Sequence, residues 1–345
     1  MARQYCGQQG KQDNCQIAVS LSLANHAASL PVAWRLYLPL EWTADAARRA
    51  AAGIPEAVGF LSKPEIALEQ IRAAWAAGLP RGVVLLDAGY GTNTWLREEI
   101  GALGLSYVAG IPSHTSVWPL GTAPLPPLPW SGRGRRPKLL RRDAEHSPVS
   151  VQALALGLPQ ACWQTISWRE GSAGALTSRF ARVRVRAAHR DEGRAEPRDE
   201  EWLLIEWPEG DAEPAKYWLA TLPPDMPFDR LVDLAKLRWR IERDYQELKQ
   251  ELGLGHYEGR GWRGFHHHAT LCIAAYAFLI AERARLSPSA AGAATDKFAA
   301  SAVPQNRPPR GAARPSRTTC RKLDRDDAPA SDRHPRNHPG AISLL

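Results

Sequence analysis

The sequence predicts an α/β protein in which helices flank a mixed sheet. Three patterns support this fold class: an apolar run that ends in Asp87, two alternating segments near the start of the chain, and a long amphipathic helix around residue 240. The run Gly82–Asp87 (GVVLLD) carries no polar side chain before its aspartate. Such a run is typical of a strand that is buried on both faces between helices, as in a partly parallel sheet.

The first hundred residues divide into short predicted elements. Residues 2–13 are polar and are expected to form a loop. Residues 15–23 and 32–38 alternate between apolar and polar side chains, which predicts two half-buried antiparallel strands. A capping box with an early proline (SKPE) begins a helix over residues 62–77, and residues 105–111 predict a further strand.

Asp87 stands at the carboxyl end of its predicted strand. In open α/β sheets this edge carries the reactive groups. An aspartate after a strand is frequently only the N-cap of the next helix. Here Thr92 is expected to cap the helix that runs to about Leu103, which would leave Asp87 available for chemistry.

The composition changes after residue 111. Five prolines lie between Pro119 and Pro129, and six of the eleven residues Gly132–Arg142 are basic, so an exposed loop is expected. Alternating segments at 178–187, 201–207 and 217–222 predict a β-rich insertion. Its first strand would carry one cationic face, formed by Arg179, Arg182, Arg184 and Arg186.

The segment Asp229–Gly253 predicts one long helix of about 35 Å, with Asp229 as its N-cap and Gly253 just beyond its end. Apolar residues recur at threes and fours and form one stripe: Leu231, Leu234, Leu237, Ile241, Tyr245, Leu248 and Leu252. A second line on the helix consists of Arg238, Glu242, Tyr245 and Lys249. From spacing alone, this line is also compatible with a solvated ion-pair face.

A second apolar helix is expected over residues 266–286, with Leu271, Ala274, Ala275 and Phe278 buried. The three histidines at 266–268 cannot all face one metal ion, because neighbouring helix positions point about 100° apart, and they are interpreted as a polar cap. Disorder is expected beyond residue 287.

The chain has a net charge of +8, which favours a polyanionic partner but is also compatible with a solubilising surface. Its five cysteines form no CxxC pair, which suggests reduced thiols and a cytoplasmic location. No signal peptide and no membrane span are predicted.

Arg238-Trp239-Arg240-Ile241-Glu242, followed by Lys249, resembles the tyrosine–arginine–glutamate–lysine signature of DDE-type insertion-sequence transposases. The position of the tyrosine falls on Ala235, so three of the four signature residues match. The resemblance extends over roughly residues 3–285, from RQYCGQQGKQDNCQ to GRGWRGFHHHATLCIAAYAFL.

This resemblance implies an RNase H-like fold that cleaves DNA and transfers the cut strand. Its two divalent cations, Mg²⁺ or Mn²⁺, would lie about 4 Å apart, one activating the attacking oxygen and the other stabilising the leaving oxygen. Asp87 and Glu242 would be the second and third metal-binding carboxylates, and Arg238, Lys249 and Tyr245 would contact DNA. The resemblance also implies a DNA-end contact for Trp262, for which burial is the alternative.

The resemblance further implies partners and a location. The partners would be double-stranded DNA, as transposon ends and target, and a second copy of the chain. The location would be the cytoplasm of a bacterium, on the nucleoid when DNA is bound.

The sequence differs from the family's pattern at the start of the chain. The family's first catalytic aspartate lies on a strand before the RQYCG segment, and Asp13 is the only early aspartate here. We therefore expect an amino-terminally truncated transposase with its first strand missing. Its expected parts are a partial core over 1–111, a loop and β-rich insertion over 112–227, the catalytic and packing helices over 228–286, and a basic tail over 287–345.

Three functions remain open from the sequence. The first is a transposase that is inactive or impaired as a truncated chain. The second is a non-catalytic DNA-binding remnant of one. The third is an unrelated two-metal phosphohydrolase, against which the basic β-rich segment argues.

Overall fold

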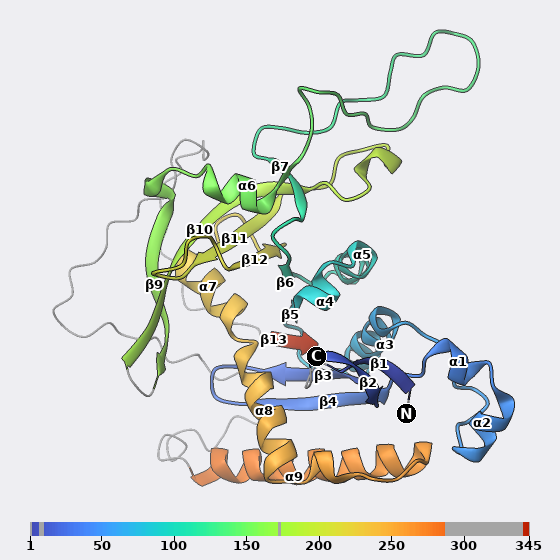
Figure 1. Cartoon of the computed structure of the whole chain (residues 1–345). Helices are drawn as coiled ribbons and strands as arrows, with labels where there is room; N and C mark the ends of the chain where they lie inside the picture. Colours follow the sequence, from blue (N-terminus) through green and yellow to red (C-terminus); the bar gives the residue numbers. More distant parts are fainter. Residues whose placement is uncertain (1, 7–9, 172–173, 287–340, 345) are drawn as a thin grey trace. The chain divides into compact units, whose positions relative to one another are not determined.

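The computed structural model describes residues 2–6, 10–171, 174–286 and 341–344 (Figure 1). The chain is a mixed α/β protein that divides into two compact units. The first unit contains the described residues up to Leu85 and from Leu237 onward, and the second runs from Leu86 to Lys236. Each unit is built around strands that are covered by helices.

The first unit begins with a hairpin of β1 (Ala2–Cys6) and β2 (Lys11–Cys15). The strands are antiparallel, with Ala2 opposite Cys15 and Cys6 opposite Lys11. The loop predicted over residues 2–13 is therefore wrong. The two strands are not recognisable from the sequence, because only Ala2 in them is fully buried and the segment therefore lacks an alternation of apolar and polar residues.

The central strands of this unit have the order β4–β3–β13–β5. Their bounds are β3 (Ala18–Ala24), β4 (Ser29–Leu36), β5 (Val83–Leu86) and β13 (Ala341–Leu344). The predicted antiparallel pairing of the two alternating segments is confirmed, with Ala18 opposite Leu36. The predicted turn between them is confirmed as well, where the Asn25 amide donates to the Ala28 carbonyl over 2.9 Å.

Strand β13 comes from the far end of the chain. It pairs antiparallel with β3 and parallel with β5, so it fills the sheet between them. The expectation of disorder is wrong for residues 341–344, and it lies outside the described residues for 287–340. Four uncharged residues give no periodic signal of their own, whereas two strand edges with open hydrogen-bonding groups can order them.

Helix α3 (Lys63–Ala76) covers this sheet and begins at the predicted capping box. The Glu65 carboxylate accepts from both the Ser62 amide and the Ser62 hydroxyl over 2.7 Å. From the middle of the helix, the Gln70 amide donates to the Val19 carbonyl over 3.0 Å and ties α3 to β3. Two short helices, α1 (Leu40–Thr43) and α2 (Ala46–Ala51), lie between β4 and α3 in the chain.

The predicted single helix Asp229–Gly253 is wrong, because it is divided into α7 (Phe228–Lys236) and α8 (Trp239–Gln250). Helix α7 begins before Asp229, which lies in its first turn. At the break, the Arg240 and Ile241 amides donate three residues back, to the carbonyls of Leu237 and Arg238. The turn is therefore tightened without proline or glycine. Gly253 follows α8 with the left-handed φ of 70° expected near a helix end.

The burial of the predicted apolar stripe is confirmed on both helices. At most 4% of each of the following side chains is exposed: Leu231, Leu234, Leu237, Ile241 and Leu248. Helix α8 passes across β3 and β4 (Figure 1). The stripe thus predicts the buried side of each helix, although it does not predict the break between them.

Helix α9 (Trp262–Leu286) starts earlier than predicted and buries another face. Its buried residues are Ala269, Cys272 and Tyr276, whereas Leu271 is 57% and Phe278 is 64% exposed. The expected burial of Leu271, Ala274, Ala275 and Phe278 is therefore wrong. The apolar side chains of this helix lie on several of its faces, so its sequence pattern does not indicate which face is buried. None of the helices in the described parts of the chain combines the length and the hydropathy that a membrane span needs.

The second unit contains strands in the order β6–β12–β11–β10–β7–β8, with β9 also paired to β10. Strand β6 (Tyr107–Ile111) pairs with β12 (Lys216–Ala220), so the β-rich segment continues the sheet that contains β6. The other strands are β7 (Ser116–Pro119), β8 (Val149–Ser150), β9 (Trp163–Gly171), β10 (Gly174–Ala187) and β11 (Glu201–Trp207). The helical segments are α4 (Ala88–Gly91), α5 (Thr94–Ala102), α6 (Val151–Leu156) and α7, with 3₁₀ turns at Gln160–Cys162 and Asp191–Gly193.

The arginines of β10 do not form an open cationic face. Arg182, Arg184 and Arg186 are each partly buried. The guanidinium groups of Arg182 and Arg184 lie 4.6 and 5.0 Å from the centre of the Trp202 ring. Arg186 donates to the Arg198 carbonyl over 2.6 Å and pairs with Glu200 over 2.9 Å. These cations stabilise the second unit, because their guanidinium groups interact with an aromatic ring, a carbonyl group and a carboxylate of the same unit.

Candidate active site

Asp87 directly follows β5, at the strand end predicted from the sequence. Its Oδ1 accepts from the Tyr90 amide over 3.0 Å, which makes Asp87 the N-cap of α4. The next helix, α5, is capped by Asn93, whose Oδ1 accepts from the Leu96 amide over 2.9 Å. The expectation that Thr92 caps a helix and leaves Asp87 uncommitted is therefore wrong. Capping occupies one lone pair of a carboxylate that has several, so it is compatible with metal binding.

The turn after Asp87 is fixed to β6 by two glycines. A Cβ built on Gly91 would overlap the carbonyl oxygen of Gly110 and would lie 3.0 Å from its carbonyl carbon. A Cβ on Gly110 would lie 3.2 Å from the Ala88 nitrogen. A side chain at position 91 is therefore excluded unless the backbone shifts, and one at position 110 would make a tight contact. This close approach determines where the Asp87 carboxylate lies within its unit.

A buried polar network also supports this turn. Arg97 of α5 is 5% exposed and donates to the carbonyl of Gly91. The Tyr107 hydroxyl donates over 2.7 Å to Glu201, which is also 5% exposed. Burial raises the pKa of Glu201, and the nearby positive charge of Arg97 opposes that rise. This network is not predicted from the sequence, where its one signal is the glutamate at the start of β11.

Glu242 lies in the first turn of α8, with 65% of its side chain exposed. Its Oε1 accepts from Arg238 over 3.1 Å. Lys249, in the last turn of the same helix, is exposed. Arg238 precedes α8, and Glu242 and Lys249 lie in its first and last turns, so the start of the helix carries an accessible carboxylate next to a guanidinium.

Tyr245 and Trp262 have packing contacts instead of open surfaces. The Tyr245 ring stacks on Trp34 with ring centres 5.7 Å apart, and burial raises the pKa of its hydroxyl. Trp262 packs against the core of Leu36, Leu38 and Ile54. These contacts favour a structural role for both aromatic side chains.

Asp244 is a buried acid that the sequence analysis did not single out. It is 6% exposed, accepts from the Tyr276 hydroxyl over 2.8 Å, and accepts from the Ser29 hydroxyl. Burial raises the pKa of the Asp244 carboxyl. A signal existed, because Asp244 falls between Ile241 and Leu248 on the buried stripe, where an acid is unexpected.

The histidines at 266–268 lie inside α9, which begins at Trp262, so the interpretation of this run as a polar cap of the helix is wrong. His266 contacts the Trp262 carbonyl through Nδ1 over 2.9 Å, and the Leu36 amide donates to its Nε2 over 3.4 Å. His268 contacts the Gly253 carbonyl through Nε2 over 2.9 Å. His267 is exposed. The first and third rings therefore join the ends of secondary-structure elements.

Asp87 belongs to the second unit and Glu242 to the first, so their shared site stays a prediction. Carboxylates are the ligands that Mg²⁺ and Mn²⁺ prefer, and both side chains fit that chemistry. In the part of the chain that the structure describes, no three Asp, Glu, His or Cys side chains form a group that could hold a metal ion. Asp13, the early aspartate, lies on β2 and accepts from the Asn14 amide over 2.7 Å.

No match was found among curated proteins. A family model described as DDE superfamily endonuclease matches residues 1–175, about half of the chain. This match covers the first strands, α3, and the Asp87 turn with its anchoring glycines. The chain therefore belongs to the DDE superfamily of endonucleases, and its mixed α/β fold agrees with the RNase H-like fold implied by its sequence.

Proposed function

We propose that this protein is a transposase by descent, which cleaves and rejoins DNA at the ends of an insertion sequence. The observation that carries the proposal is the placement of Asp87 at the end of β5, on a turn anchored by Gly91 and Gly110, within the segment matched to the endonuclease family. A carboxylate fixed in this way can bind a divalent cation with little reorganisation.

The remaining machinery of the proposal comes from α8. Glu242 would supply the third carboxylate of the family's metal site, and Arg238 and Lys249 would contact phosphates beside the scissile bond. Divalent cations, when bound, would neutralise charge on the reacting phosphate. The role of this chain's residues is to hold the ligands and the DNA. Tyr245 and Trp262 would support this surface through packing.

The test is metal-dependent nicking of supercoiled DNA that carries the ends of the element. Glu242→Gln should abolish nicking in Mg²⁺ and in Mn²⁺. Glu251→Gln, which removes an exposed carboxylate just beyond the same helix, should leave it unchanged. Equal nicking by the Glu242→Gln variant and the unaltered chain would remove Glu242 from the site.

A second candidate function is DNA binding without catalysis. It is supported by the net charge of +8 and by the exposed basic segment between β7 and β8. This function predicts DNA binding that weakens steeply as salt rises, without nicking in either metal. Nicking that is lost in Asp87→Asn and in Glu242→Gln would exclude it.

A further inference from the structure

The second unit carries an exposed segment over residues 126–139, which we name the basic arm. Every residue from Leu128 to Leu139 is exposed. Arg133, Arg135, Arg136 and Lys138 lie near its tip, and the sequence contains no acidic residue from Gly121 to Arg142. Four cations are therefore presented together without a neighbouring carboxylate in the arm itself.

The base of the basic arm is closed like a hairpin. Leu125 and Arg141 exchange backbone hydrogen bonds of 2.8 and 2.9 Å. Leu140 is 5% exposed, and its amide donates to the Arg194 carbonyl over 2.9 Å. The two ends of the arm are thus joined to each other and to the body of the unit.

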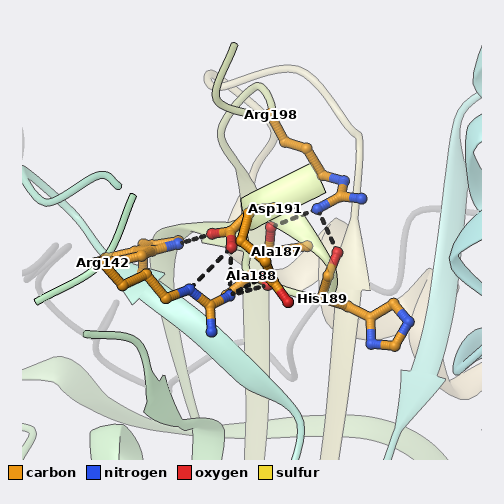
Figure 2. A network of polar contacts seen from close by, with 8 residues as sticks. Arg142, Ala187, Ala188, His189, Asp191 and Arg198 are labelled. Atoms are coloured by element: carbon orange, nitrogen blue, oxygen red, sulfur yellow. Dashed lines mark hydrogen bonds and ion pairs between the residues drawn. The ribbon is translucent and has the colours of Figure 1, made fainter. Parts of the chain in front are cut away.

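A buried aspartate fixes this base further (Figure 2). Asp191 is 2% exposed and accepts from Arg142 Nε over 3.0 Å and from the Trp118 indole. Arg142 also donates to the Ala188 carbonyl over 2.6 Å. Arg198 donates to the His189 carbonyl over 2.7 Å in the same network. Arg142 is therefore used as an anchor at the base of the arm, whereas the four cations at the tip are exposed.

The basic arm is also stiff for its length. Pro126, Pro127 and Pro129 form one leg, and proline-rich segments adopt an extended conformation with little freedom to lose on binding. At the tip, Gly132 and Gly134 have φ of 82° and 74°, and the Trp130 indole donates to the Gly134 carbonyl over 3.2 Å. Seven residues per leg reach at most roughly 25 Å, which is enough to follow a DNA groove.

We propose that the basic arm is a separate DNA-binding element, which grips duplex phosphates through Arg133, Arg135, Arg136 and Lys138. The choice of DNA as the ligand rests on the proposed function. The proposal that the arm is a binding element rests on its exposure, its positive charge and the anchoring of its base. Because these contacts are to phosphates, they supply affinity and orientation without reading sequence.

The test measures the affinity for a short DNA duplex at several salt concentrations between about 50 and 200 mM, in EDTA so that cleavage does not intervene. Replacing all four cations by glutamine should reduce the slope of log affinity against log salt by about 3 to 4. The matched control replaces four exposed cations elsewhere, Lys11, Arg48, Arg81 and Lys216, by glutamine. Its slope should change by less than about 1, because these residues are not expected to contact phosphates.

The possible outcomes separate the two proposals. Equal slopes for the arm variant and the control variant would overturn the arm as a DNA-binding element while leaving DNA as the substrate. Loss of single-strand binding with unchanged duplex binding would also overturn it. Absence of DNA binding by the unaltered chain would overturn both. The melting temperature of the arm variant should match that of the unaltered chain, since the substituted residues are exposed.

Discussion

Gly91 of α4 and Gly110 of β6 are in direct backbone contact, closer than any side chain between them would permit. This contact lies directly behind the turn that Asp87 caps. The position of the proposed metal ligand within its unit therefore depends on two residues that carry no chemistry of their own.

Gly91→Ala should destabilise the second unit by about 2–3 kcal/mol, as overpacking does when the neighbour cannot move aside. The atom that a Cβ would meet belongs to the backbone of β6, so repacking of side chains cannot relieve the overlap. Urea unfolding followed by tryptophan fluorescence measures the change. The control is Gly101→Ala in α5, where a Cβ would meet nothing within 4 Å. That substitution should leave stability unchanged or raise it by up to about 1 kcal/mol. Equal effects of the two substitutions would show that the close contact does not constrain the fold.

Asp244→Asn should change how stability depends on pH. Burial raises the pKa of Asp244 from its ordinary value of 3.8, so the folded chain holds this proton at a higher pH than the unfolded chain does. The protonated Asp244 carboxyl makes its whole contribution to stability at pH values below its pKa in the unfolded chain. This contribution is lost as pH rises through the pKa that the carboxyl has in the folded chain. Asparagine stays neutral, and it can still accept from Tyr276. The free energy of unfolding of Asp244→Asn should therefore rise relative to that of the unaltered chain as pH increases from about 4 to 7.

The matched control for this pH series is Asp225→Asn, which replaces an exposed carboxylate in the other unit. A constant difference between Asp244→Asn and the unaltered chain at all pH values would contradict a charge effect at Asp244.

Strand β13 predicts a long-range dependence of the first unit on the end of the chain. Ile342→Pro removes a backbone donor from a strand that lies between two partners, where proline is not accommodated. Amide hydrogen exchange should then accelerate in β3 and in Val83–Leu85, the residues that face β13. Ile342→Val keeps the β preference and should keep the protection. Unchanged exchange in both variants would mean that β13 does not stabilise the sheet in solution.

Several features of this fold could be predicted because their causes are local. The capping box at Ser62 and Glu65 contains its own hydrogen-bond partners. The β3–β4 pair follows from alternation and a short turn, and the apolar stripe of α7 and α8 follows from helical spacing.

Two of the errors have a different cause, which is a partner distant in sequence. Strand β13 is ordered by β3 and β5, each far from it along the chain. The buried face of α9 is the one whose Tyr276 reaches Asp244, and nothing in the α9 sequence marks that choice. The expectation that Asp87 has no capping role fails for a local reason: Thr92 is a plausible cap for the next helix, but Asn93, one residue later, caps α5, and Asp87 caps α4. The joint site of Asp87 and Glu242 stays a prediction, since the two residues belong to different units.

The two roles of Asp87 can be separated by a pair of substitutions. Asparagine is as good an N-cap as aspartate, so Asp87→Asn should preserve the hydrogen bond from the Tyr90 amide and change stability by less than about 0.5 kcal/mol. Alanine cannot accept that bond, so Asp87→Ala should cost about 1 kcal/mol. The amide of asparagine lacks the negative charge that a divalent cation requires, so both variants should lose the stabilisation produced by Mg²⁺ or Mn²⁺.

The readout for this pair is the melting temperature with and without added MgCl₂ or MnCl₂, since a ligand that binds only the folded chain raises it. In EDTA the order of stability should be the unaltered chain and Asp87→Asn together, with Asp87→Ala below them. With metal, the unaltered chain alone should rise. A metal-dependent rise in Asp87→Asn equal to that of the unaltered chain would leave Asp87 with a capping role only, and the cation would then have to bind elsewhere.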